Sequence, residues 1–117
     1  MIKVLVIDDS FSMRSLVAKT LSGSGYEVVE AKDGKEGLEL AGRQPFNLVI
    51  SDVNMPVMDG LTFVREFRRK APYVPVLILT TEVDPAKKAE AKKAGATGWI
   101  TKPFEPQSLL TTIKKVT

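Results

Sequence analysis

The sequence alternates five times between short apolar, β-branched runs and longer stretches with helical periodicity. The runs VLVI, LVI and VLIL are almost continuously apolar, which is typical of strands covered on both faces. The strands are predicted at Lys3–Ile7, Tyr26–Glu30, Asn47–Ser51, Pro75–Leu79 and Thr97–Ile100. This alternation predicts parallel strands joined by right-handed helical crossovers. The expected fold is α/β: a doubly wound, five-stranded parallel sheet with five helices, in three layers.

Local signals mark the ends of the predicted helices. The first helix is expected to bury an apolar stripe of Met13, Leu16, Val17 and Leu21. Asp33 followed by Glu36 is a carboxylate version of the capping box at the start of the second helix. Asp84 and Pro85 predict the N-cap and first residue of the fourth helix, and Gly95 predicts its end.

Composition excludes several kinds of site. The 117 residues include no cysteine and no histidine, so disulfides, thiolate chemistry and imidazole ligands are absent. Any metal must then be held by oxygen atoms, which points to magnesium or calcium. The net charge is only +3, with lysines spread over several segments, and no apolar run approaches the length of a membrane span. We therefore expect a cytoplasmic protein that binds neither nucleic acid nor membrane. We also expect a monomer.

Polar side chains follow four predicted strands, at the sheet edge where ligands bind in open parallel sheets. Asp8 and Asp9 follow the first strand and Asp52 the third, while Thr80 and Lys102 follow the fourth and fifth. Each alone has an ordinary explanation, because aspartates commonly cap helices or form turns and lysines are usually solvated. Their joint position at one edge favours a shared site.

The chemistry of this cluster is consistent. Three neighbouring carboxylates cannot all stay ionised without a counter-charge, and magnesium supplies one while keeping coordination positions free. Asp52, alone on its strand, is then placed as a carboxylate nucleophile towards phosphorus. Lys102 would offset charge on the transferring group, and the Thr80 hydroxyl could donate to a phosphoryl oxygen.

The chain resembles a response-regulator receiver domain over essentially its whole length, and within that family the single-domain, CheY-like chemotaxis receivers. The resemblance is carried by VLVIDDS, SDVNMPVMDG, LILTTE and GATGWITKPF, in the family's order and spacing. It implies the strand order 2-1-3-4-5. It also implies these roles: Asp52 as phospho-acceptor; Asp8, Asp9, Asp52 and the backbone carbonyl of Asn54 around one Mg²⁺ ion; Thr80 as switch hydroxyl; and Lys102 as phosphate-contacting ammonium.

The resemblance further implies a phosphorylation-dependent switch, not an enzyme, although it assists its own phosphorylation and dephosphorylation. The donor would be a phosphohistidine on a histidine kinase. The output protein would dock on the face formed by the fourth helix, fifth strand and fifth helix, with the flagellar motor switch as one candidate. The alternative is a stand-alone receiver acting as a phosphorelay intermediate or phosphate sink in another circuit. We expect one receiver domain over residues 1–117, without an output domain.

Trp99 departs from the family pattern. This position on the fifth strand usually holds a tyrosine or phenylalanine that swings inward when the threonine engages the phosphate. The indole of Trp99 either moves in the same way or simply packs against the fourth or fifth helix. The sequence leaves both interpretations open.

Three further features are interpreted through the resemblance. Asn54 and Glu82 each lie two residues beyond a key position, where the family tunes hydrolysis of the acyl phosphate, and their polarity predicts a short-lived phosphoryl group. Gly60 is expected to supply a positive φ in the loop after Asp52. Lys102–Pro103 resembles the family's cis peptide, a geometry confined in practice to X-Pro bonds, and the sequence leaves open whether this bond is cis.

Two other functional classes fit parts of the pattern. A small flavodoxin-like nucleotide binder would share the sheet, but no glycine-rich or hydroxyl-rich loop follows the first strand, where Asp8 and Asp9 would repel a phosphate. A phosphatase with an aspartyl nucleophile typically carries D-x-D at this place, whereas the aspartates here are adjacent.

Overall fold

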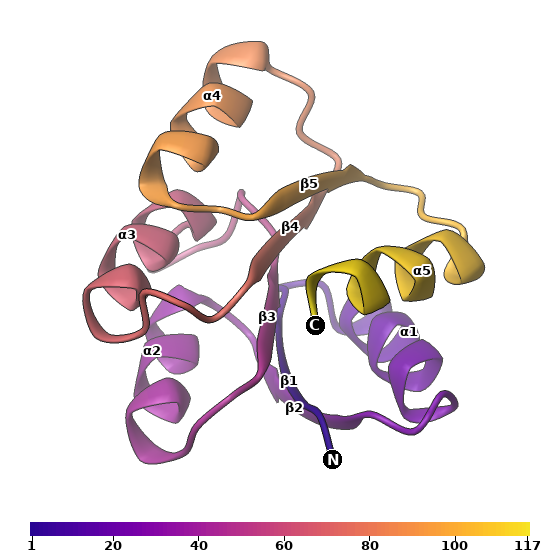
Figure 1. Ribbon diagram of the computed structural model, residues 1–117. Helices are drawn as coiled ribbons and strands as arrows, with labels where there is room; N and C mark the ends of the chain where they lie inside the picture. The colour runs from indigo at the N-terminus through magenta and orange to yellow at the C-terminus, as the bar shows by residue number, and fades with distance from the viewer.

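The computed structural model describes all residues from Met1 to Thr117. Five strands and five helices alternate along the chain, which confirms the predicted pattern (Figure 1). The strands are β1 (Lys3–Ile7), β2 (Glu27–Ala31), β3 (Leu48–Ser51), β4 (Val76–Thr80) and β5 (Gly98–Thr101). The helices are α1 (Phe11–Ser22), α2 (Gly34–Arg43), α3 (Gly60–Lys70), α4 (Pro85–Ala94) and α5 (Pro106–Val116).

The strands form one parallel sheet in the order β2-β1-β3-β4-β5, so the order implied by the resemblance is confirmed. β3 and β4 are buried at every residue, as expected for central strands covered on both faces. Ile7 pairs with Ser51 at the ends of β1 and β3. Asp8 and Asp52, the next residues, therefore leave the sheet side by side.

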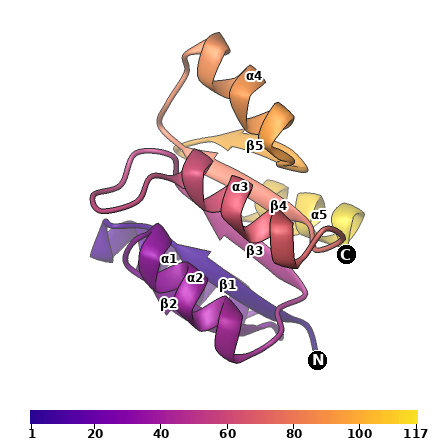
Figure 2. The same cartoon turned by 90° about the vertical axis from the view of Figure 1, so that its left-hand side faces the viewer.

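Helices cover both faces of the sheet. Helices α1 and α5 lie on one face, and α2, α3 and α4 lie on the other (Figures 1 and 2). Each face has its own apolar core, one built around Phe63 and Ile78 and the other around Leu21 and Leu79. Ile78 and Leu79 are neighbours in β4 that point to opposite faces, because side chains alternate along a strand. No helix combines the length and the apolar character needed to cross a bilayer.

The predicted helix starts are confirmed by capping contacts. The Asp33 carboxylate accepts a hydrogen bond from the Glu36 N–H at 2.9 Å, and Asp84 accepts from the Ala86 N–H at 2.9 Å. Gly95 ends α4 in the left-handed conformation, with a φ of 112°. Because each helix begins after a strand ends, these N-termini lie at the same sheet edge as the predicted site.

The structure corrects two details of the prediction. Four strands begin one residue later than expected, and β2, β4 and β5 also end one residue later, so Thr80 is the last residue of β4 rather than the residue after it. The later start of β4 follows from Pro75, which has no N–H to donate to a strand ladder. The expected burial of Leu16 is wrong, because the residue is 49% exposed. Val17 and Leu21, four residues apart, form the buried stripe of α1, and Leu16 lies off that stripe by about 100° of helix rotation.

Candidate functional site

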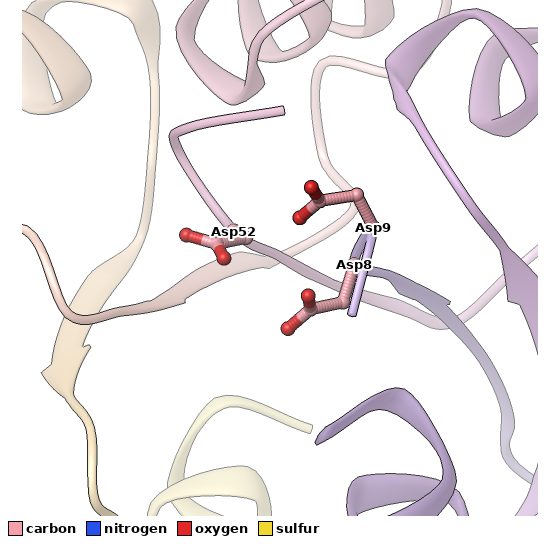
Figure 3. Close-up of side chains that lie close together, drawn as sticks. All are labelled: Asp8, Asp9 and Asp52. Carbon is pink, nitrogen blue, oxygen red and sulfur yellow. The ribbon is translucent and has the colours of Figure 1, made fainter. Parts of the chain in front are cut away.

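The carboxyl edge of the sheet brings together Asp8, Asp9 and Asp52. One oxygen from each carboxylate lies within 4.8 Å of the others. Figure 3 shows the three side chains directed towards a common space, two from the segment after β1 and one from the segment after β3. The predicted acidic cluster is therefore present as a geometric unit.

Backbone donors hold the two buried aspartates in place. Asp8 is 4% exposed, and its Oδ1 accepts from the Ser10 N–H at 2.9 Å. Asp52 is 9% exposed, and its Oδ1 accepts from the Val53 N–H at 2.6 Å. Asp9 is exposed. The remaining oxygens of Asp8 and Asp52 are thus directed into the site.

Lys102 reaches these remaining oxygens from the segment after β5. Its Nζ donates to Asp8 Oδ2 at 2.7 Å and to Asp52 Oδ2 at 3.1 Å, with only 6% of the side chain exposed. Burial alone would lower the pKa of Lys102, but the hydrogen bonds to Asp8 and Asp52 and their charges together outweigh it and raise the pKa. Lys102 therefore stays charged beside the aspartates.

The site as a whole retains excess negative charge. Three carboxylates face one ammonium, and only oxygen atoms are available as ligands. Hard divalent cations prefer this donor set, and magnesium commonly binds through one or two carboxylates while keeping water. The residues therefore fit a magnesium ion.

Thr80 ends the neighbouring strand β4 and is fully buried. Its Oγ1 accepts from the Glu82 N–H at 3.1 Å and donates to no other group in the chain. The backbone carbonyl of Thr80 accepts from the Lys102 N–H at 2.7 Å. This backbone hydrogen bond holds the segment that carries the Lys102 ammonium beside the residue that carries the Thr80 hydroxyl.

Asn54 and Glu82 are brought into direct contact. The Asn54 side-chain amide donates to Glu82 Oε1 at 3.1 Å, linking the loop after β3 to the loop after β4. Lys87, in the first turn of α4, lies 3.2 Å from the same oxygen. Hydrogen bonds from Asn54, from the Asp84 N–H and from Lys87 lower the pKa of Glu82 from its ordinary value to about 2.

Trp99 packs on the α4 side of the sheet. It pairs with Ile78 across the strands and contacts the apolar cluster that contains Ala91 of α4. Of the two helices considered from the sequence, α4 is therefore the one against which the indole packs. The indole borders a hollow of about 480 Å³ between α4 and β5, which Lys88 and Lys92 also line.

The loop after Asp52 corrects the expectation for Gly60. Its φ is not positive; the positive φ in this loop belongs to Val57, at 68°. Glycine is needed at position 60 for a different reason, because a Cβ there would lie 1.9 Å from the Asp52 carbonyl oxygen. The Lys102–Pro103 bond is cis, as the resemblance implies.

Two residues at the site were missed in the sequence. Lys87 contacts Glu82 across a loop, and Arg14 donates to the Asp8 carbonyl oxygen at 2.7 Å while pairing with Glu30 at 3.1 Å. None of these three contacts joins residues at a helical or strand spacing, so no local sequence pattern predicts them. An excess of lysines in α4 was the only available signal for Lys87.

The sequence matches a known protein family. The family model described as response regulator receiver domain matches residues 4–114. The chain belongs to this family. The receiver domain of two-component signalling is a signalling switch, and its family binds Mg²⁺ in an acidic pocket that corresponds to the Asp8, Asp9 and Asp52 cluster.

Individual relatives of this receiver domain include chemotaxis proteins. The structure of chemotaxis protein CheY4 from Vibrio cholerae has 50% sequence identity and a TM-score of 0.95, covering 100% of this chain and 99% of that one. Chemotaxis protein CheY1 of Helicobacter pylori is 42% identical over 111 residues, which is 92% of this chain and 90% of that protein. The receiver is thus CheY-like in sequence and in fold.

Other relatives are longer. The probable transcriptional regulator ycf27 of Porphyridium aerugineum is 39% identical over 114 residues, or 97% of this chain and 47% of that protein. The receiver therefore spans about half the length of such relatives.

Proposed function

We propose that this receiver is switched by phosphorylation of Asp52. The observation that carries the proposal is the Asp52 carboxylate, which is held by the Val53 N–H and by Lys102 within the acidic cluster. A carboxylate oxygen of Asp52 attacks the phosphorus of a phosphohistidine on a histidine kinase. The phosphorus–nitrogen bond breaks, and the imidazole leaves with the electron pair and takes up a proton.

The cluster has a supporting role in this transfer. Asp8, Asp9, Asp52 and the backbone carbonyl of Asn54 would hold one magnesium ion, which offsets charge on the phosphoryl oxygens when it is bound. Lys102, released from part of its contact with Asp52, binds a phosphoryl oxygen. The Thr80 hydroxyl, which donates to no group in the chain, donates to another. Asp8 and Asp9 do no covalent chemistry.

The output follows from the position of Thr80 at the end of β4, just before the loop that leads to α4. Movement of Thr80 towards the phosphoryl group shifts the β4–α4 loop and opens space for Trp99, which borders the hollow between α4 and β5. The face of α4, β5 and α5 then changes shape for an output protein. Asn54 and Glu82 flank the attacking water in hydrolysis of the acyl phosphate, and their polarity favours a short-lived signal.

The circuit we propose is chemotaxis, with the flagellar motor switch as the output partner. The sequence identity to the chemotaxis proteins CheY4 (50%) and CheY1 (42%) supports this choice. The longer regulator ycf27 matches this chain over only 47% of its own length. A cell lacking the protein should swim with altered turning frequency if the proposal holds.

The direct test uses Trp99, the only tryptophan. Its fluorescence is followed while Mg²⁺ and then acetyl phosphate are added, and the phosphoryl group is detected by mass. Wild type should gain one phosphoryl group with a fluorescence change, Asp52→Asn should gain none, and Asp9→Asn should need more Mg²⁺. No gain of mass in wild type would contradict the phosphorylation proposal, whereas a gain without a fluorescence change would contradict only the movement of Trp99.

A further inference from the structure

Lys87 closes a polar network that joins three segments at the edge of the site. Its Nζ lies 3.2 Å from Glu82 Oε1 and 3.4 Å from Asn54 Oδ1. Glu82 belongs to the loop before α4, Asn54 follows Asp52 by two residues, and Lys87 lies in the first turn of α4. The Lys87 ammonium therefore contacts both side chains that flank the phosphorylation site.

The donors of this network occupy the hydrogen-bond acceptor positions of the Glu82 carboxylate. Oε1 accepts from Asn54 Nδ2 at 3.1 Å and contacts Lys87, while Oε2 accepts from the Val83 and Asp84 N–H groups, each at 3.2 Å. A carboxylate offers about four lone-pair sites. All four have donors, and the carbonyl oxygen of the Asn54 amide is engaged by Lys87 as well.

We propose that Lys87 is a positioning residue that prolongs the life of the phosphorylated form by denying Asn54 and Glu82 to the attacking water. This inference rests on the proposed phosphorylation of Asp52. In hydrolysis, the water oxygen bonds to phosphorus while the bond from phosphorus to the Asp52 carboxylate oxygen breaks. The products are the free carboxylate and inorganic phosphate, and a proton of the water passes to solvent.

The side-chain oxygens of Asn54 and Glu82 affect the rate of this hydrolysis, because they can accept a hydrogen bond from the attacking water. A free oxygen on Asn54 or Glu82 can accept a hydrogen bond from the water and hold it in line with phosphorus. With Lys87 in place, Glu82 Oε1 has two donors and Asn54 Oδ1 has one, so fewer acceptor positions remain to orient the water. Lys87 thereby moderates the fast hydrolysis that two polar residues at these positions favour.

The test compares Lys87→Met, Lys87→Arg and the control Lys35→Met. Lys35 also lies in the first turn of a helix at the same sheet edge, is exposed and forms no side-chain hydrogen bond or ion pair, so its replacement controls for loss of one positive charge. Each protein is phosphorylated with acetyl phosphate and Mg²⁺, the donor is removed by rapid desalting, and loss of the phosphoryl group is followed by mass.

We expect Lys87→Met to shorten the lifetime of the phosphorylated form by about threefold or more, since partners in one hydrogen-bond network are energetically coupled. Lys87→Arg, which keeps the cation, and Lys35→Met should match wild type. An unchanged or longer lifetime in Lys87→Met, or an equal shortening in Lys35→Met, would overturn the inference.

A second measurement does not depend on phosphorylation. In the unphosphorylated protein, Lys87→Met should shift the NMR signals of the Glu82 carboxyl carbon and the Asn54 side-chain amide, whereas Lys35→Met should leave both in place. Unmoved signals in Lys87→Met would overturn the network. Wild type that takes up no phosphoryl group would instead contradict the proposed function, which is a separate result.

Discussion

At the residue scale, the geometry of the site depends on close contact between backbone segments as well as on the chemistry of the side chains. Gly60 shows this: its N–H donates to the Val53 carbonyl oxygen at 2.7 Å, and the Asp52 carbonyl oxygen occupies the space that a Cβ at this position would need. This contact draws the start of α3 against the backbone that carries Asp52. The backbone that carries Asp52, the proposed phospho-acceptor, can lie this close to α3 only because residue 60 has no Cβ.

The Gly60→Ala variant should be strongly destabilised. Its Cβ would lie 1.9 Å from the Asp52 carbonyl oxygen, so the backbone must shift, at a cost of about 2 kcal/mol or more in the free energy of unfolding. Urea unfolding measures this. The control is Gly42→Ala in α2, where an added Cβ meets nothing within 4 Å and should stabilise the helix by up to about 1 kcal/mol. Equal stabilities of the two variants would contradict the prediction.

At the element scale, each helix begins with a side chain that satisfies its first N–H groups. In α5 the cap is Glu105, whose carboxylate accepts from the Gln107 and Ser108 N–H groups at 3.1 Å and from the Ser108 hydroxyl at 2.8 Å. These bonds lower the pKa of Glu105 below its ordinary value of 4.5, with the Ser108 hydroxyl as the largest cause. The ionised carboxylate is thus part of the helix start.

Replacing Glu105 by glutamine should destabilise the protein in a pH-dependent way. Because the folded-state pKa lies below 4.5, the ionised cap contributes its full stability above pH 4.5 and loses it as the pH falls through the folded-state value. Wild type should therefore exceed Glu105→Gln in free energy of unfolding near neutral pH, and the gap should close in acid. Urea unfolding across this range measures the gap, with Glu39→Gln, an exposed residue without side-chain bonds, as control. A gap independent of pH would argue against the charged cap.

At the scale of the whole molecule, stability is distributed unevenly around the sheet. Helix α3 buries five residues, including Phe63 and Phe67, whereas α4 buries only Ala91 and borders the hollow beneath it. The far end of α4 is anchored by Arg68, which donates to the Gly95 carbonyl oxygen at 2.9 Å. A helix that buries a single alanine is suited to move when the site changes.

Hydrogen exchange should reveal this difference. Amides of α4 should exchange by local opening and therefore faster than amides of α3, which open only with the core. Exchange followed by mass spectrometry on peptides from the two helices measures the contrast, with β4 as the fully protected reference. Equal protection of α3 and α4 would contradict the picture of a loosely packed helix.

Much of the fold and part of the site could be predicted from local pattern. The apolar runs and caps encode strands and helix starts, because periodicity and capping act over a few residues, and parallel strands then bring Asp8, Asp52, Thr80 and Lys102 to one edge. The errors arose where burial depends on a partner element, as at Leu16, whose exposure is decided by which side of α1 meets the sheet.

The types of functional residue and their order along the chain could thus be predicted from VLVIDDS and the three other motifs that carry the family resemblance. Only the folded chain decided that Gly60 is required by contact rather than by φ, that Trp99 faces α4, and that Lys87 engages Asn54 and Glu82. The physical reason is range: backbone propensity is set by neighbours in sequence, whereas close approach and ion pairing join segments that meet only after the sheet has formed.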